Sequence, residues 1–98
     1  MINLGRLTLE CHAYAKGQGF WDVAPEEHIV PAKLMLIVSA VAEAMEAHRN
    51  HQVMAEELAD IIIRVCDLAG ARGINLEEAV LLKMEHNKTR QHLHGKRY

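Results

Sequence analysis

Residues 34–49 read LMLIVSAVAEAMEAHR, and apolar side chains recur in this stretch at the three- and four-residue intervals of an α-helix. We expect a helix over residues 32–49 that stops near residues 50–51. A helix with one apolar face is expected to pack against other helices, and His48 on that face is interpreted as a packing residue. The predicted apolar face consists of Leu34, Ile37, Val38, Val41, Met45 and His48.

Three further helices are predicted on either side of this one. A first helix over residues 2–16 ends at a break, Gly17-Gln18-Gly19. Residues 53–71 form the next helix, which Gly73 is suited to end in a left-handed conformation. Asn75 is a suitable N-cap for a last helix over residues 76–90. Residues 20–31 contain both prolines and are predicted to be an irregular loop, as is the polar tail, residues 91–98.

The composition supports a single all-α domain over residues 1–98. Half of the 98 residues are hydrophobic but only 4% are aromatic, an aliphatic composition typical of helices. This hydrophobic fraction excludes a disordered chain. Because a domain of this size buries a limited core, we expect it to complete that core by association with copies of itself.

Several functional classes are disfavoured. No apolar run approaches the roughly 20 residues of a membrane span, and the first residues lack the layout of a signal peptide. We therefore expect a cytoplasmic protein without a membrane partner. The net charge of −2 argues against nucleic acid as a partner. Cys11 and Cys66 are far apart in sequence and form no C-x-x-C motif, so they are predicted to be free thiols.

Three of the predicted helices carry a polar stripe beside their apolar face. Converging carboxylates repel one another unless a hard divalent cation such as Mg²⁺ binds them, and cationic side chains suit a polyphosphate. The alternative is that these stripes are solvated faces with ion pairs, such as Asp60 with Arg64 or Glu43 with Lys33. The stripes are Lys33, Leu36, Ala40, Glu43 and Ala47; Glu57, Asp60 and Arg64; and Lys83, Asn87 and Arg90.

The order and spacing of these segments resemble the MazG-like nucleoside triphosphate pyrophosphohydrolases. The resemblance covers KGQGFWD at residues 16–22, the stretch quoted above, EELADIIIRVCDLA at residues 56–69 and the chain from residue 83 onward. The metal motif of that family is E-x-x-E followed by E-x-x-D. Glu57 and Asp60 match its second half, and Glu43 matches the last position of its first half. The terminal K-x-x-x-N-x-x-R pattern is met by Lys83, Asn87 and Arg90.

One position departs from the motif, because Ala40 stands where its first glutamate belongs. A shifted register with Glu43 and Glu46 as the pair is disfavoured, since Glu46 points away from the stripe. The chain is therefore either a designed Glu-to-Ala variant or a natural member with altered activity. The intact remainder of the motif favours the first explanation.

The resemblance implies a MazG-like helical bundle, completed as a homodimer or homotetramer, that cleaves a nucleoside triphosphate to the monophosphate and pyrophosphate. It implies that Glu43, Glu57 and Asp60 hold Mg²⁺, with Mn²⁺ as a substitute. Glu43 and the residue at position 40 take the catalytic positions. Implied substrate-binding residues are Lys33, Lys83, Asn87 and Arg90 for the phosphates, and Trp21 and Phe20 for stacking on the base.

Alternatives to this interpretation exist. Trp21 serves equally well as an anchor that closes its loop over the bundle. The whole chain can also be interpreted as a nucleotide-binding or sensing module without turnover, or as a helical oligomerisation domain without a ligand. The sequence does not identify the base or the sugar, because related enzymes act on phosphoribosyl-ATP or on dCTP and dUTP.

Overall fold

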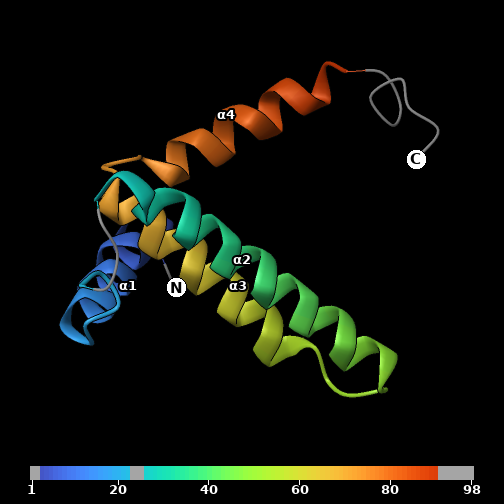
Figure 1. The fold of residues 1–98 in the computed structure, drawn as a ribbon. Coiled ribbons are helices and arrows are strands. Elements are labelled where there is room, and N and C mark those ends of the chain that lie inside the picture. The colour runs from blue at the N-terminus through green and yellow to red at the C-terminus, as the bar shows by residue number, and fades with distance from the viewer. Residues whose placement is uncertain (1–2, 23–25, 91–98) are drawn as a thin grey trace.

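The computed structural model describes residues 3–22 and 26–90. This part of the chain forms four helices and contains no strand: α1 (Leu4–Gly17), α2 (Glu26–Arg49), α3 (Ala55–Ala71) and α4 (Leu76–Lys88) (Figure 1). The predicted all-α class is confirmed. Within the same residues no helix combines the length and hydropathy needed to cross a membrane. The tail predicted to be irregular, residues 91–98, lies outside the described residues.

Helix α1 begins and ends where its local sequence dictates. The side chain of Asn3 accepts a hydrogen bond from the backbone N–H of Arg6, which satisfies one of the free donors at the helix start. After Gly17 the chain turns through Gly19, whose φ of 82° a residue with a side chain rarely adopts. The turn brings Phe20 and Trp21 back toward the bundle.

Helix α2 begins earlier than predicted. Residues 20–31 were expected to be irregular because they contain both prolines, but the helix starts at Glu26 and includes Pro31. A proline inside a helix removes one backbone hydrogen bond. Here the loss falls near the start of a 24-residue helix, so most of its hydrogen bonds are unaffected.

The face of α2 that is buried differs from the predicted apolar face. The predicted apolar residues Leu34, Val38, Val41, Met45 and His48 are exposed in the single chain, whereas Ile37 is half-buried. Small side chains permit a closer approach of two helices than leucine or methionine would, which accounts for the choice of face. The residues buried against the rest of the chain are Lys33, Ala40, Ala44 and Ala47.

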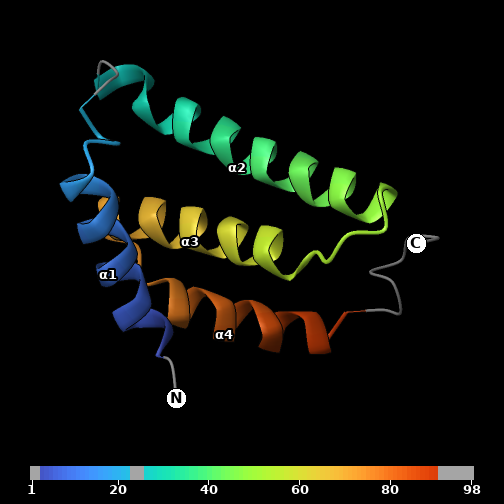
Figure 2. The same cartoon turned by 90° about the horizontal axis from the view of Figure 1, so that it is seen from below.

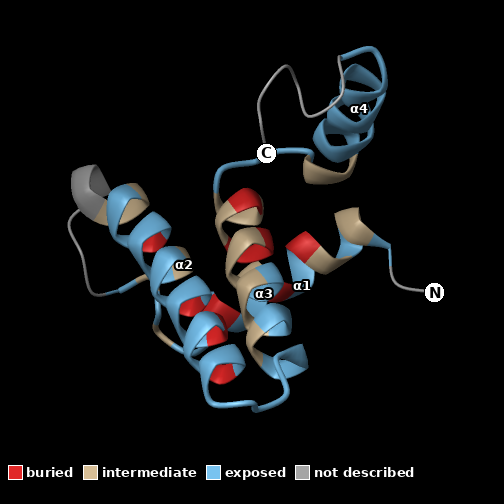
Figure 3. Cartoon of the chain, turned by 90° about the vertical axis from the view of Figure 1, so that its right-hand side faces the viewer, coloured by how far each residue is buried: buried red, intermediate tan, exposed pale blue. Residues whose placement is uncertain are grey.

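Helix α3 lies between α2 and α1 and packs against both (Figure 3). It buries Cys66, Asp67 and Ala69. At the contact with α1, a Cβ atom on Gly70 would lie 2.6 Å from the backbone oxygen of Thr8. Only glycine fits there, so the small residue sets how closely α1 and α3 approach.

Helix α4 contacts α1 at its start (Figure 2) and diverges from α2 and α3 (Figure 1). Asn75 caps it by accepting a hydrogen bond from the backbone N–H of Glu78, as the sequence predicted. None of its residues is buried. A single chain thus leaves apolar side chains of three helices in contact with water, including Val38 and Val41 on α2, Leu58 and Ile62 on α3, and Leu81 and Leu82 on α4.

Candidate functional site

A cavity of about 560 Å³ opens where α1, the turn after it, α2 and α3 meet. Most of its wall is apolar or aromatic. Four charged side chains, Lys33, Asp60, Arg64 and Asp67, also line it. A largely apolar hollow with a few convergent polar groups is the usual form of a small-molecule site. The apolar and aromatic residues of the wall include Tyr14, Phe20, Ile29, Leu36 and Ile63.

Lys33 is the most deeply buried of the cationic side chains in this wall. It is 9% exposed, and its Nζ atom donates a hydrogen bond of 2.6 Å to the backbone oxygen of Phe20. The same ammonium group lies 4.5 Å from the centre of the Trp21 ring. The π-face and the carbonyl oxygen together offset part of the cost of burying the charge. Lys33 is therefore held beside the cavity and does not pair with Glu43, which is exposed.

Asp60 and Arg64 form an ion pair in the cavity wall. The Nε atom of Arg64 donates to Oδ2 of Asp60 over 3.0 Å, across one turn of α3. The sequence predicted this ion pair as the alternative to a metal site on the polar stripe of Glu57, Asp60 and Arg64. Because both side chains are more than a third exposed, the pair contributes little stability and can open to a ligand.

Trp21 is anchored to α3. Its Nε1 atom donates a hydrogen bond of 2.9 Å to Oδ1 of Asp67, and Nδ1 of His12 lies 2.9 Å from the same oxygen. The His12 and Trp21 rings meet edge to face at 5.2 Å between centroids. These contacts join the turn, α1 and α3 through one carboxylate, which favours the anchor interpretation of Trp21.

His12 and Asp67 were not among the site residues predicted from the sequence. A signal for Asp67 exists, because it continues the stripe of Glu57, Asp60 and Arg64 by one further helical turn. His12 has no comparable signal, since its partner lies 55 residues away in the chain.

The proposed metal ligands are not gathered in this structure. Glu43 is exposed, Glu57 and Asp60 are half-buried, and Ala40 is 2% exposed on the side of α2 that packs on α3. In the described part of the chain, no three His, Cys, Asp or Glu side chains form a group able to hold a metal ion. Carboxylate oxygens are suitable Mg²⁺ ligands. However, position 40 is an alanine and Asp60 is paired with Arg64, so this chain lacks a complete set of oxygen ligands for Mg²⁺.

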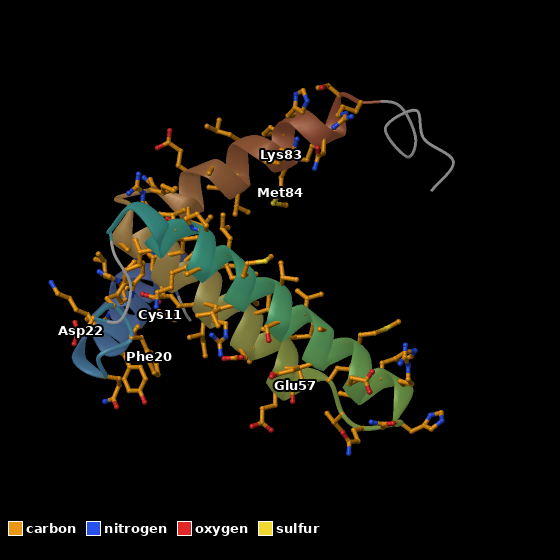
Figure 4. All side chains as sticks on the ribbon, viewed as in Figure 1. Cys11, Phe20, Asp22, Glu57, Lys83 and Met84 are labelled. Atoms are coloured by element: carbon orange, nitrogen blue, oxygen red, sulfur yellow. The ribbon has the colours of Figure 1, made fainter. Side chains whose placement is uncertain are left out.

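The polar stripe of α4 stands apart from the acids of α3. Lys83 and Asn87 lie on α4, whereas Arg90 follows the helix, which ends at Lys88 and not at residue 90 as predicted. All three are exposed, and Figure 4 shows Lys83 well separated from Glu57 near the start of α3. Of the predicted phosphate-binding residues, one copy of the chain brings Lys33 to the cavity that Asp60 lines, but it does not bring Lys83, Asn87 and Arg90 to the predicted metal ligands. Comparisons with protein-family models, curated proteins and solved structures gave no match to this chain. The interpretation of the site therefore depends on its own residues.

Proposed function

We propose that the chain is the scaffold of a Mg²⁺-dependent nucleoside triphosphate pyrophosphohydrolase in which Ala40 replaces a carboxylate. The observation that carries this proposal is the position of Asp60. The last acid of the E-x-x-D sequence lines an apolar cavity that also holds two cationic side chains, Lys33 and Arg64. A cavity with an apolar wall can hold a planar base, and the charged side chains in that wall can interact with phosphates or with a metal ion bound to them. This combination suits a nucleotide.

The base of the nucleotide occupies the cavity in this proposal. The rings of Tyr14 and Phe20 line it and offer planar surfaces for stacking. Lys33 can donate a hydrogen bond to an acceptor on the edge of the base. Trp21 is not among the lining residues and is already bound to Asp67, so the predicted stacking role is better assigned to Tyr14 and Phe20.

In this proposal Glu43, Glu57 and Asp60 would hold Mg²⁺, and the phosphates would extend from the cavity toward these acids. When bound there, the metal ion would neutralise phosphate oxygens and activate water. A glutamate at position 40 would add an oxygen donor from the interface between α2 and α3, where Ala40 is buried. Its carboxylate would complete the metal site or orient the water that attacks phosphorus.

A second copy of the chain supplies Lys83, Asn87 and Arg90. Two features support this part of the proposal: the stripe lies apart from the acids within one copy, and apolar side chains of α2, α3 and α4 are exposed. Contiguous exposed apolar side chains are typical of surfaces that bind another protein chain. A homodimer or homotetramer would cover them and complete the site.

The experiment that tests the proposal restores the carboxylate. Ala40→Glu is assayed for pyrophosphate release from a panel of ribo- and deoxyribonucleoside triphosphates with Mg²⁺. Ala40→Gln is the matched control, because it has the same shape without the charge. The unmodified chain and Ala40→Gln are expected to release no pyrophosphate above background.

A second candidate function is a nucleotide-binding module without turnover. The buried Lys33 beside an intact cavity, next to an incomplete set of acids, favours it. Calorimetry on the unmodified chain distinguishes the two functions. Nucleotide binding together with an inert Ala40→Glu protein supports the module. If neither protein binds a nucleotide, the remaining interpretation is a helical oligomerisation domain without a ligand.

A further inference from the structure

The two cysteines of the chain meet at the contact between α1 and α3. Cys11 is 8% exposed and Cys66 is 1% exposed. Their separation in sequence predicted two free thiols, and both are free in the structure. The fold nevertheless places them on facing sides of crossing helices. Cys11 also forms part of the cavity wall, so a small solute in the cavity can reach it.

Two neighbouring contacts fix how the cysteines face each other. On one side, Gly70 of α3 packs directly against the backbone of Thr8 of α1. On the other side, His12 and Asp67, the residues that follow the two cysteines, are joined by a contact of 2.9 Å. The pair is thus held from both sides at the closest approach of the two helices.

The thiols themselves lie close together, because they stand between the Gly70–Thr8 and His12–Asp67 contacts. Burial raises the pKa of both thiols above the ordinary value, so both are protonated at neutral pH. The form that reacts with oxidants is the thiolate, and its scarcity makes the pair slow to oxidise.

We propose that Cys11 and Cys66 form a reversible intramolecular redox pair, with Cys11 as the residue that reacts first with a peroxide. The sulfur of Cys11 attacks one oxygen of hydrogen peroxide, the O–O bond breaks, and Cys11 sulfenic acid and one water are formed. The sulfur of Cys66 then attacks the sulfenic sulfur, and the hydroxyl group leaves as a second water. The two thiols have lost two electrons and two protons, and the peroxide has been reduced to water.

The disulfide would link α1 to α3 across more than half of the chain. A cross-link that closes a long loop restricts the unfolded chain and so favours the folded one. It would also fix the α1 side of the cavity wall. This inference does not depend on the proposed enzymatic function and is tested without nucleotides.

The test treats the 98-residue chain with hydrogen peroxide at low protein concentration. The protein is then unfolded, alkylated and digested, and its peptides are analysed by mass spectrometry. We expect a Cys11–Cys66 cross-linked peptide from monomeric protein and no alkylated cysteine, with both thiols recovered after dithiothreitol. The oxidised monomer should melt at a higher temperature than the reduced one. Oxidation should accelerate as the pH rises, because the thiolate fraction increases.

Two single variants test the order of the reaction. In Cys66→Ser, the sulfenic acid of Cys11 has no resolving thiol and should be trapped by dimedone. Cys11→Ser should give markedly less trapped product, because Cys66 does not line the cavity. Equal or greater trapping at Cys66 would overturn the assignment of Cys11 as the first residue. The pair itself would be overturned by two alkylated thiols even after prolonged exposure to peroxide at raised pH, or by disulfides only between chains. Oxidation of Cys11 beyond the sulfenic acid with Cys66 free would overturn it as well.

Discussion

Single residues determine how the turn after α1 is attached to the bundle. Asp67 accepts a hydrogen bond from Trp21 and contacts His12, and Trp21 in turn lies under the ammonium group of Lys33. The acidic stripe of α3 could be predicted from helical spacing, and one of its members, Asp60, does line the cavity. The links among Asp67, His12 and Trp21 could not be predicted, because they join residues whose proximity depends on how three segments pack.

Removal of the Asp67 carboxylate should loosen this attachment. In Asp67→Ala the indole N–H of Trp21 and the ring of His12 lose their shared partner, and we expect a loss of about 1–3 kcal/mol in the free energy of unfolding. Asp67→Asn keeps an oxygen acceptor at nearly the same place and should lose less. Urea titration followed by Trp21 fluorescence measures both. Equal stability of Asp67→Ala and the unmodified chain would contradict the anchor role.

A glutamate at position 40 should make stability depend on metal. Ala40 is buried against α3, so an ionised carboxylate there without a cation should cost on the order of 3 kcal/mol. Mg²⁺ should recover much of this loss in Ala40→Glu and little in Ala40→Gln. Thermal melting with and without Mg²⁺ provides the measurement. The same Mg²⁺ response in both variants would argue against a metal site at this position.

The sequence predicts that the chain is made of four helices. It predicts less well where each helix begins and which face of it is buried. The glycine break after α1 and the Asn75 cap are local signals, and both appear in the structure. The start of α2 was missed because Pro31 is tolerated near a helix start. Its buried face was missed because hydrophobicity alone favours Val38 and Met45, whereas close packing on α3 selects Ala40, Ala44 and Ala47.

The close approach of α1 and α3 should make Gly70 sensitive to even one methyl group. The Cβ atom of Gly70→Ala would lie 2.6 Å from the Thr8 oxygen, so the helices would have to separate. We expect a loss of about 1–3 kcal/mol, larger than the gain in helix propensity. Gly17→Ala is the matched control, because no atom lies within 4 Å of its added Cβ. Chemical unfolding of both variants compares the two sites, and a neutral Gly70→Ala would show that this contact does not set the helix spacing.

At the scale of the whole molecule, the predicted site is divided. The acids lie on α2 and α3, the predicted phosphate-binding residues Lys83, Asn87 and Arg90 lie on α4 and just after it, and apolar side chains of all three helices are exposed. The sequence predicted both halves because each is a stripe on one helix. It could not predict that one copy of the chain holds them apart, because that depends on the direction in which α4 leaves α3.

Complementation between subunits tests whether two copies share a site. In the Ala40→Glu background, Asp60→Asn and Lys83→Ala should each abolish pyrophosphate release. If Lys83 of one copy completes the site formed by the acids of the other, each mixed dimer of the two variants contains one intact site. Random mixing should then restore about a quarter of the parental activity. No recovery in mixtures that are shown to exchange subunits would place both residues in the same copy.

The most direct test of the central claim is the pyrophosphate assay on Ala40→Glu with Mg²⁺. We expect this single carboxylate to produce pyrophosphate and a nucleoside monophosphate in equal amounts from at least one nucleoside triphosphate. Ala40→Gln and the unmodified chain should remain at background. A folded Ala40→Glu protein that releases no pyrophosphate from any nucleotide of the panel would contradict the account.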